Sequence, residues 1–256
     1  MSARHTSRAT LLLGAGATAV LVPVLALAGL PLMDSIALAV LLGLLPALSV
    51  AQLHLMEGVQ IERIPAYVSS AITLVVLGGG CLLVGIRKGG PAAVGLVSLS
   101  PASLAGWGAG LAMAGLALML AFRRMATGLG LREARVLREL LPRTSRERWI
   151  FGGLSLAAGL GEEMAYRGYA LTVLAGVVGT GVAAVVTSLV FGVLHAYQGG
   201  LGMLRACALG GILAWGFLAA GSLWPAMVAH ALLDVMAGIV LAERLMVPEA
   251  RVGVSG

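Results

Sequence analysis

The chain contains apolar runs that are each about as long as a helix needs to cross a bilayer. They cover residues 9–30, 35–56, 66–86, 102–122, 149–172, 178–198, 203–221 and 223–242. A transmembrane helix needs about 20 such residues, and helices are the economical form because backbone groups in lipid must satisfy one another. Only 11% of the residues are charged, against about 25% in soluble domains. The sequence therefore predicts an all-α, polytopic integral membrane bundle of about eight transmembrane helices.

The basic charge of the chain is concentrated in one polar stretch. Sixteen Arg accompany a single Lys, and eight of the Arg lie between residues 123 and 148 together with three Glu. Positive charge marks the cytoplasmic side of a membrane and favours anionic lipid, so this pattern indicates membrane topology and no nucleic-acid binding. Counting crossings in both directions from 123–148 places both termini in the cytoplasm, although Arg87 and Lys88 then fall on the outer side. An Arg-rich chain of this kind is expected in a bacterial plasma membrane.

Four segments follow from these patterns. Residues 1–122 form N-terminal transmembrane helices, 123–148 a basic cytoplasmic or interfacial linker, 149–242 a core that holds nearly all of the candidate chemistry, and 243–256 a C-terminal tail. The first run resembles a signal peptide at its "ALA" but is too long for one, so we expect a retained helix. Leucines at helical spacing in 131–141 predict a helix lying in the membrane interface and ending at Pro142. Thr144 and Glu147 have the spacing of a capping box for the next helix.

Ionisable residues interrupt an apolar helix in the stretch "GLGEEMAYRGYA" at 159–170. Glu163 and Arg167 are four residues apart, so they share a helix face and can pair. Glu162 lies about 100° further round the helix and must face elsewhere. Charged groups at bilayer depth are costly and usually face the bundle interior. Glu162 is therefore either a polar clamp between helices or a functional group.

Two histidines and a second carboxylate interrupt later helices. His195 closes "SLVFGVLHAYQGG", one turn after Phe191, and His230 and Asp234 share a face of the last run. Each residue alone could be a core or interfacial residue. Together with Glu162 they are the parts of a hydrolytic site, in which a carboxylate acts as general base. Glu162, His195 and His230 could instead bind a divalent metal such as Zn²⁺, with an open position for water. Spacing alone does not separate these options.

Three motifs in this order resemble the CPBP intramembrane proteases, the CAAX-protease and bacteriocin-processing group also called Abi. They are Glu162-Glu163-Met164-Ala165-Tyr166-Arg167, Phe191-Gly192-Val193-Leu194-His195 and His230-Ala231-Leu232-Leu233-Asp234, the last preceded by Gly-Ser-Leu-Trp-Pro. The resemblance covers about residues 149–240.

The resemblance implies that Glu162 activates water with help from His195, and that Glu163 and Arg167 support the site. It also implies that His230 and Asp234 orient groups or stabilise the oxyanion. Relatives that trim prenylated CAAX proteins have Asn at the position of Asp234, and an ionised Asp cannot donate a hydrogen bond as Asn can. The family mechanism is read as either metal-dependent or metal-free.

The expected function is hydrolysis of a peptide bond in a membrane-associated peptide or protein. Two alternatives remain open. One is a non-catalytic membrane partner or immunity protein of the same fold. The other is a proton-coupled transporter that uses Glu162 and the histidines as a relay. The absence of a visible sequence repeat counts against a transporter.

Overall fold

A computed structural model describes residues 2–56 and 60–246, and within these residues the regular elements are helices, without strands. Helices labelled α are α-helices, and those labelled η are 3-10 or π-helices. The elements are α1 Ser2–Leu27, α2 Leu32–Ala39, η1 Val40–Leu44, α3 Leu45–Met56, α4 Arg63–Gly85, η2 Ile86–Lys88, η3 Pro91–Val94, α5 Pro101–Gly128, α6 Arg135–Glu139, α7 Ser145–Glu163, η4 Met164–Leu171, α8 Thr172–Val178, α9 Thr180–Leu194, η5 Ala196–Gln198, α10 Gly199–Ala220, α11 Trp224–Val235, η6 Met236–Val240 and α12 Ala242–Leu245. Most of the predicted tail lies outside the described residues.

Each predicted apolar run is helical, and within the described residues five helices are long and apolar enough to cross a membrane. These five are Arg8–Leu27, Leu32–Leu53, Arg63–Lys88, Pro101–Gly128 and Ala196–Ala220. The other three runs form α7 with η4 and α8, the short α9, and α11 with η6. Large apolar side chains on the long helices are exposed, among them Leu12, Val76 and Leu83. A surface of this kind needs lipid around it. The protein is a polytopic all-α integral membrane bundle.

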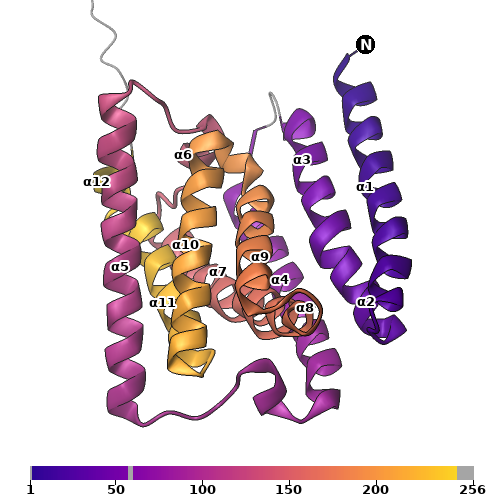
Figure 1. Cartoon of the computed structure of the whole chain (residues 1–256). Coiled ribbons are helices and arrows are strands. Elements are labelled where there is room, and N and C mark those ends of the chain that lie inside the picture. The colour runs from indigo at the N-terminus through magenta and orange to yellow at the C-terminus, as the bar shows by residue number, and fades with distance from the viewer. Residues whose placement is uncertain (1, 57–59, 247–256) are drawn as a thin grey trace, which may run out of the picture.

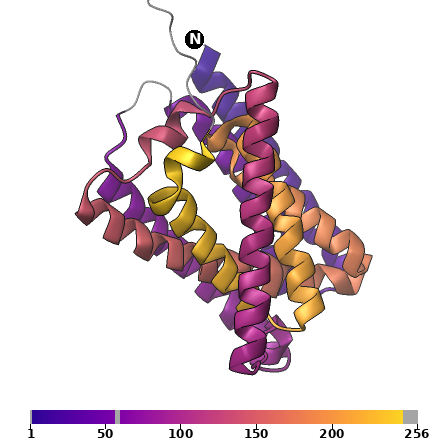
Figure 2. The same cartoon turned by 90° about the vertical axis from the view of Figure 1, so that its left-hand side faces the viewer.

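The buried segment η4 lies at the centre of the bundle, where it packs against α4, α7 and α9. In Figure 1, α1 lies beside α2 and α3 at one side of the bundle and α5 lies at the other. α10 packs on α9 and α5, while α11 packs on α7 and α5. Figure 2 shows α7 running obliquely across the bundle. The segment that carries both glutamates therefore passes through the interior of the protein.

Glycines set the closest helix crossings around α7. A methyl group on Gly161 would overlap the backbone carbonyl of Leu74 on α4, and Gly78 faces Gly161 in the same crossing. On another side of α7, a methyl group on Gly159 would lie 2.7 Å from the carbonyl oxygen of Met227 on α11. Small residues let transmembrane helices approach closely enough for backbone contact. These crossings hold α7 tightly between α4 and α11.

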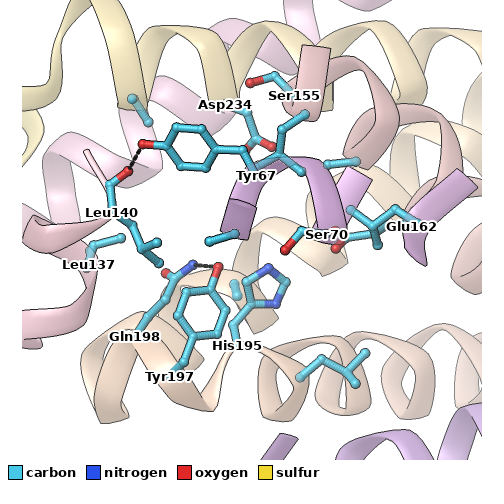
Figure 3. A pocket seen from close by; sticks show the side chains of 18 of the residues that line it. Tyr67, Ser70, Leu137, Leu140, Ser155, Glu162, His195, Tyr197, Gln198 and Asp234 are labelled. Atoms are coloured by element: carbon cyan, nitrogen blue, oxygen red, sulfur yellow. Dashed lines mark hydrogen bonds between the residues drawn. The ribbon is translucent and has the colours of Figure 1, made fainter. Parts of the chain in front are cut away.

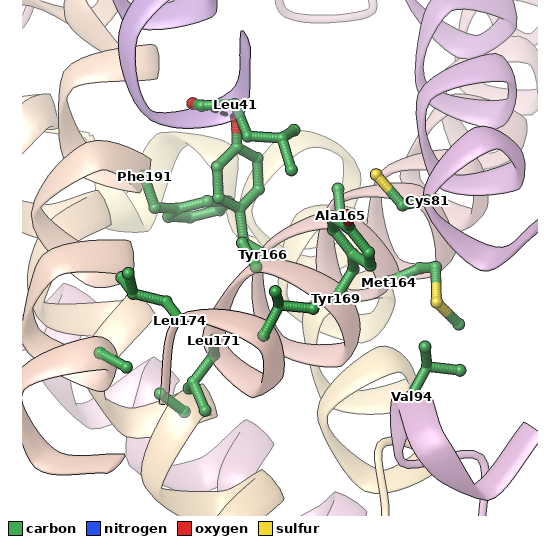
Figure 4. Packing of buried hydrophobic residues seen from close by; sticks show 14 of the residues in the cluster. Leu41, Cys81, Val94, Met164, Ala165, Tyr166, Tyr169, Leu171, Leu174 and Phe191 are labelled. Atoms are coloured by element: carbon green, nitrogen blue, oxygen red, sulfur yellow. Dashed lines mark hydrogen bonds between the residues drawn. The ribbon is translucent and has the colours of Figure 1, made fainter. Parts of the chain in front are cut away.

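Two π-helical segments begin next to the predicted site residues. η4 starts immediately after Glu163, and η6 starts two residues after Asp234. π-turns inside α-helices are rare and occur often at functional sites. In Figure 4 the η4 side chain of Tyr166 extends towards Leu41 and Phe191 in the apolar core. The hydroxyl of Tyr166 is 3.5 Å from the Leu41 carbonyl oxygen, and its ring packs edge-on against that of Phe191.

The linker differs from its prediction. α5 continues to Gly128, and the expected helix over 131–141 is reduced to α6, Arg135–Glu139. The helix is therefore shorter than predicted, and the side chains of Leu137, Leu140 and Leu141 line a cavity of the bundle. The position of this segment in the membrane interface stays a prediction. The helix is short because partners from distant parts of the chain hold the backbone on both sides of α6. Arg205 on α10 pairs with Glu133, and the hydroxyl of Tyr67 on α4 donates to the carbonyl of Leu140.

The start of α7 agrees with the predicted capping box. The Thr144 hydroxyl accepts a hydrogen bond from the Glu147 N–H, and the Glu147 carboxylate accepts one from the Thr144 N–H. Backbone N–H donors from Arg143 and Thr144 hold the pKa of Glu147 below its usual range. The cap gives α7 a fixed beginning on the linker side of the bundle.

Candidate active site

A cavity of about 770 Å³ lies inside the bundle and is lined by Glu162, His195, His230 and Asp234. Figure 3 shows Glu162, His195 and Asp234 arranged around this space. Its other polar lining residues are Ser49, Gln52, Tyr67, Ser69, Ser70, Thr73, Ser155, Tyr166, Tyr197, Gln198 and Arg205. The four ionisable groups come from α7, from the C-cap of α9 and from α11. The structure thus brings together residues that are far apart in the sequence.

His195 reaches the level of the other residues because α9 is short. The helix has 15 residues and rises about 1.5 Å per residue, which is less than the roughly 30 Å of a bilayer core. His195 caps it, and the chain turns through η5 to Gly199, whose φ of +75° suits a residue without a side chain. The helical run is thus interrupted before Gly199, and this interruption sets the depth of His195.

Glu163 and Arg167 form a buried ion pair beneath the cavity. Both side chains are fully buried, and Arg167 Nη1 donates to Glu163 Oε1 at 2.6 Å. The guanidinium carbon lies 4.3 Å from the centre of the Phe191 ring, which adds a cation–π contact. On α10, Gly210 leaves space for the guanidinium, because a methyl group there would lie 2.8 Å from Arg167 Nη2. Glu163 and Arg167 do not line the cavity. They form the pair that their spacing in the sequence predicted.

His230 is oriented by the same carboxylate oxygen. His230 Nδ1 lies 2.8 Å from Glu163 Oε1. Because the carboxylate accepts and already binds Arg167, Nδ1 is the nitrogen that carries the proton. His230 Nε2 then faces Glu162 Oε2 at 3.7 Å and Asp234 Oδ2 at 3.8 Å. These distances are longer than a direct hydrogen bond, and a water molecule in the cavity can bridge the groups from one side.

Backbone geometry fixes the tautomer of His195. His195 Nδ1 lies 2.8 Å from the carbonyl oxygen of Phe191, one turn earlier on α9. A carbonyl oxygen can only accept, so Nδ1 carries the proton and Nε2 keeps its lone pair in the neutral ring. The ring of Phe191 lies between the two histidines, with its centre 4.6 Å from that of His195 and 5.9 Å from that of His230. His195 thus offers a basic nitrogen at the cavity wall.

The ionisable residues do not form a metal site in this arrangement. Among the described residues, no group of three or more His, Cys, Asp or Glu side chains is placed to hold a metal ion. In the suggested set of Glu162, His195 and His230, the closest atoms of the first and third are 3.7 Å apart. The second nitrogen of each histidine is bound to another partner, an arrangement that also occurs around metal-ligating histidines. In this arrangement the three side chains are not gathered as a three-ligand group.

Several lining residues were not identified from the sequence. Tyr197 and Gln198 lie two and three residues after His195, and that proximity in the sequence was the available signal. Arg205 forms hydrogen bonds to Glu133 and Gln198. Ser70 on α4 comes from the N-terminal helices, which contain none of the predicted site residues. In Figure 3 it is drawn with its hydroxyl near the middle of the cavity.

The fold and the cavity define the protein as an integral membrane protein with ionisable residues around a chamber inside its helix bundle. Residues 144–236 match the family model described as "Rce1-like: Type II CAAX prenyl endopeptidase Rce1-like". The match spans α7 to α11 and the motifs at Glu162, His195 and His230, and it confirms the resemblance to CPBP-type proteases over these residues. Neither the curated proteins nor the solved structures give a significant match to the chain.

Proposed function

We propose that the protein is an intramembrane endopeptidase that hydrolyses a peptide bond in a membrane-associated peptide or protein. The observation that carries the proposal is the convergence of Glu162, His195, His230 and Asp234 on one cavity within the helix bundle. The type II CAAX endopeptidase description of the matching family supports the same reaction class. Apolar lining residues such as Leu45, Leu77 and Leu154 fit a substrate that arrives from lipid.

Glu162 is the proposed general base. It is the only one of the two adjacent glutamates that lines the cavity, and 17% of its side chain is exposed while Glu163 is fully buried. A water between Glu162 and His230 can give its proton to the Glu162 carboxylate as its oxygen bonds to the peptide carbonyl carbon. When the tetrahedral intermediate collapses, the C–N bond breaks and Glu162 returns the proton to the leaving amine.

In this mechanism the two histidines orient and polarise the attacking water and the substrate. Glu163 fixes His230 with Nε2 towards the cavity, and Arg167 fixes Glu163, so the ring is held before substrate arrives. His195 offers its Nε2 lone pair to a proton of the water or of the substrate. Fixed groups in a site shielded from bulk water act more strongly than in bulk water.

The test compares two Glu→Gln variants in liposomes with a library of quenched fluorescent peptides carrying membrane anchors, including prenylated C-termini. We expect Glu162→Gln to lower kcat by about 10²- to 10⁴-fold, the usual contribution of a general base. The control is Glu139→Gln, whose carboxylate pairs with the exposed Arg135 on α6. Equal cleavage by wild type and Glu162→Gln would contradict the role of Glu162. Absence of cleavage by wild type would favour a non-catalytic membrane partner.

A chelator arm tests the metal-free form of the mechanism. Because the donors do not form a three-ligand group, we expect cleavage to continue after exhaustive treatment with a chelator. Loss of cleavage that is restored by added Zn²⁺ would contradict metal-free chemistry. It would show that Glu162, His195 and His230 move together when substrate binds.

A further inference from the structure

Tyr197 places a hydroxyl group in the cavity beside His195. Both residues line the cavity, and their ring centres are 6.0 Å apart with the planes inclined by 32°. Figure 3 shows the Tyr197 hydroxyl beside the His195 ring, joined by a hydrogen bond to Gln198. The Tyr197 hydroxyl has no role in the hydrolysis steps assigned to Glu162 and the histidines.

A chain of hydrogen bonds sets the direction in which Tyr197 can donate. The Arg205 guanidinium donates through Nη1 to Glu133 Oε1 at 2.9 Å and through Nη2 to Gln198 Oε1 at 3.3 Å. A guanidinium has donors only, so Gln198 must present its carbonyl oxygen to it. The amide nitrogen of Gln198 therefore faces Tyr197 and donates to its hydroxyl oxygen at 3.0 Å.

The proton of the Tyr197 hydroxyl is consequently free. Its oxygen accepts from Gln198, so the O–H cannot donate back along the same contact. In the part of the chain that the structure describes, this hydroxyl donates to no protein acceptor. Two other tyrosines of the cavity differ, because the hydroxyls of Tyr67 and Tyr166 face backbone carbonyls of Leu140 and Leu41.

The proposed reaction needs a donor that this position can supply. Negative charge develops on the carbonyl oxygen during attack, and hydrogen-bond donors aimed at that oxygen stabilise it. His195 Nδ1 is committed to the Phe191 carbonyl and His230 Nδ1 to Glu163. Asp234 carries a carboxylate, which accepts when ionised. Tyr197 is an uncommitted donor on the His195 side of the cavity.

We propose that the Tyr197 hydroxyl donates to the carbonyl oxygen of the scissile peptide and to the oxyanion formed from it. Gln198 acts as a positioning residue for this hydroxyl, and Arg205 with Glu133 fixes the direction of the Gln198 amide. The inference rests on the proposed endopeptidase function. It adds a catalytic residue that the three motifs do not contain.

The test measures kcat, KM and the affinity for a phosphonate peptide, which resembles the tetrahedral intermediate. Tyr197→Phe removes only the hydroxyl, and loss of one such donor lowers kcat by about 10²- to 10³-fold. We expect KM to change by less than about twofold and phosphonate affinity to fall by the same factor as kcat. Tyr67→Phe is the matched control, since its hydroxyl is already engaged. Ser70→Ala tests the other cavity hydroxyl that has no protein partner among the described residues.

Gln198→Glu provides a readout that a merely structural role would not give. A carboxylate at position 198 still accepts from Arg205, but it also accepts from Tyr197 and draws the hydroxyl away from the substrate. We expect this variant to lose about as much kcat as Tyr197→Phe, and the double variant to lose no more than either one. Independent effects would instead multiply.

Three outcomes would overturn the inference. An active wild type with unaffected Tyr197→Phe would remove Tyr197 from the mechanism and leave the endopeptidase proposal standing. A large loss in Ser70→Ala together with a small loss in Tyr197→Phe would transfer the donor role to α4. A wild type that cleaves no peptide and does not bind the phosphonate would overturn the inference and the proposed function together.

Discussion

Glu162 and Glu163 are neighbours in the chain, but their side chains meet different surroundings. A helix turns about 100° per residue, so one carboxylate faces the cavity and the other the interior between α7 and α11. Glu163 there binds Arg167 and His230 through one oxygen, while its other oxygen has no hydrogen-bond partner within the described residues. The buried Glu163 carboxylate thus holds both the Arg167 guanidinium and the His230 ring in place.

Replacing Arg167 with Ala is predicted to destabilise the protein strongly. The change leaves Glu163 as a fully buried charge without its arginine. Breaking a buried pair costs about 3–5 kcal/mol. Arg135→Ala is the matched control, because Arg135 and Glu139 have the same spacing but the Arg side chain is 79% exposed, and such pairs contribute about 1 kcal/mol or less. Thermal unfolding in detergent, followed by tryptophan fluorescence, measures both. Equal changes in Tm would contradict the anchoring role of Arg167.

Some of the side-chain contacts in the site could be predicted from the sequence. The spacing of Glu163 and Arg167 predicted their pairing, and the same reasoning left Glu162 facing elsewhere. The bond from His230 to Glu163 joins residues 67 positions apart, and no periodicity within a helix reveals such a contact. The contact from Arg205 to Glu133 was hidden for the same reason, because it joins residues 72 positions apart, whereas the contacts of Gln198 with Arg205 and Tyr197 are local.

Among the elements, α7 depends most on small residues. Gly159 and Gly161 allow α11 and α4 to approach opposite sides of the turn that precedes Glu162. Direct backbone contact fixes the position of α7 more firmly than flexible side chains would. The helix crossings therefore control where the proposed base lies.

Gly161→Ala is predicted to lower both stability and cleavage. Its methyl group would overlap the backbone of Leu74, which cannot move without shifting α4. Overpacking of this kind typically costs about 1–3 kcal/mol, and a displaced α7 carries Glu162 away from His230. Gly153→Ala on the same helix is the control, because a methyl group there meets no atom within 4 Å. Tm and kcat should both fall for Gly161→Ala and stay near wild type for Gly153→Ala. Unchanged values for both variants would refute a tight crossing at this point.

Sequence patterns predicted the helices well and the linker poorly. The apolar runs located each long helix because lipid demands about 20 apolar residues in every crossing. In the linker, the spacing of Leu137, Leu140 and Leu141 is compatible with contact to lipid or to protein. In the structure these side chains line the cavity. The π-turns after Glu163 and near Asp234 also depend on neighbouring helices, so the local sequence did not indicate them.

Across the whole molecule, the positive charges at the end opposite the linker have local partners. Lys88 Nζ lies 2.8 Å from Asp34 Oδ2, and the Tyr169 hydroxyl donates to the other oxygen of Asp34 at 2.8 Å. Arg87 Nη1 lies 2.9 Å from the sulfur of Met33. Lys88 is therefore neutralised within the fold, which weakens its influence on topology. The arginines of the linker then decide the orientation.

We predict that the linker end of the bundle faces the cytoplasm and the loop before α5 faces the opposite side. Ser145 and Ser98 are exposed at these two ends, and Figure 1 places the ends at opposite limits of the bundle. Ser98→Cys and Ser145→Cys are made separately in a background without Cys81 and Cys207. A membrane-impermeant maleimide should label position 98 in intact cells, and position 145 only after permeabilisation. The reverse pattern would invert the orientation, because the arginines of the linker would then lie outside. Labelling of both positions in intact cells would contradict a bundle that separates its two ends by a membrane.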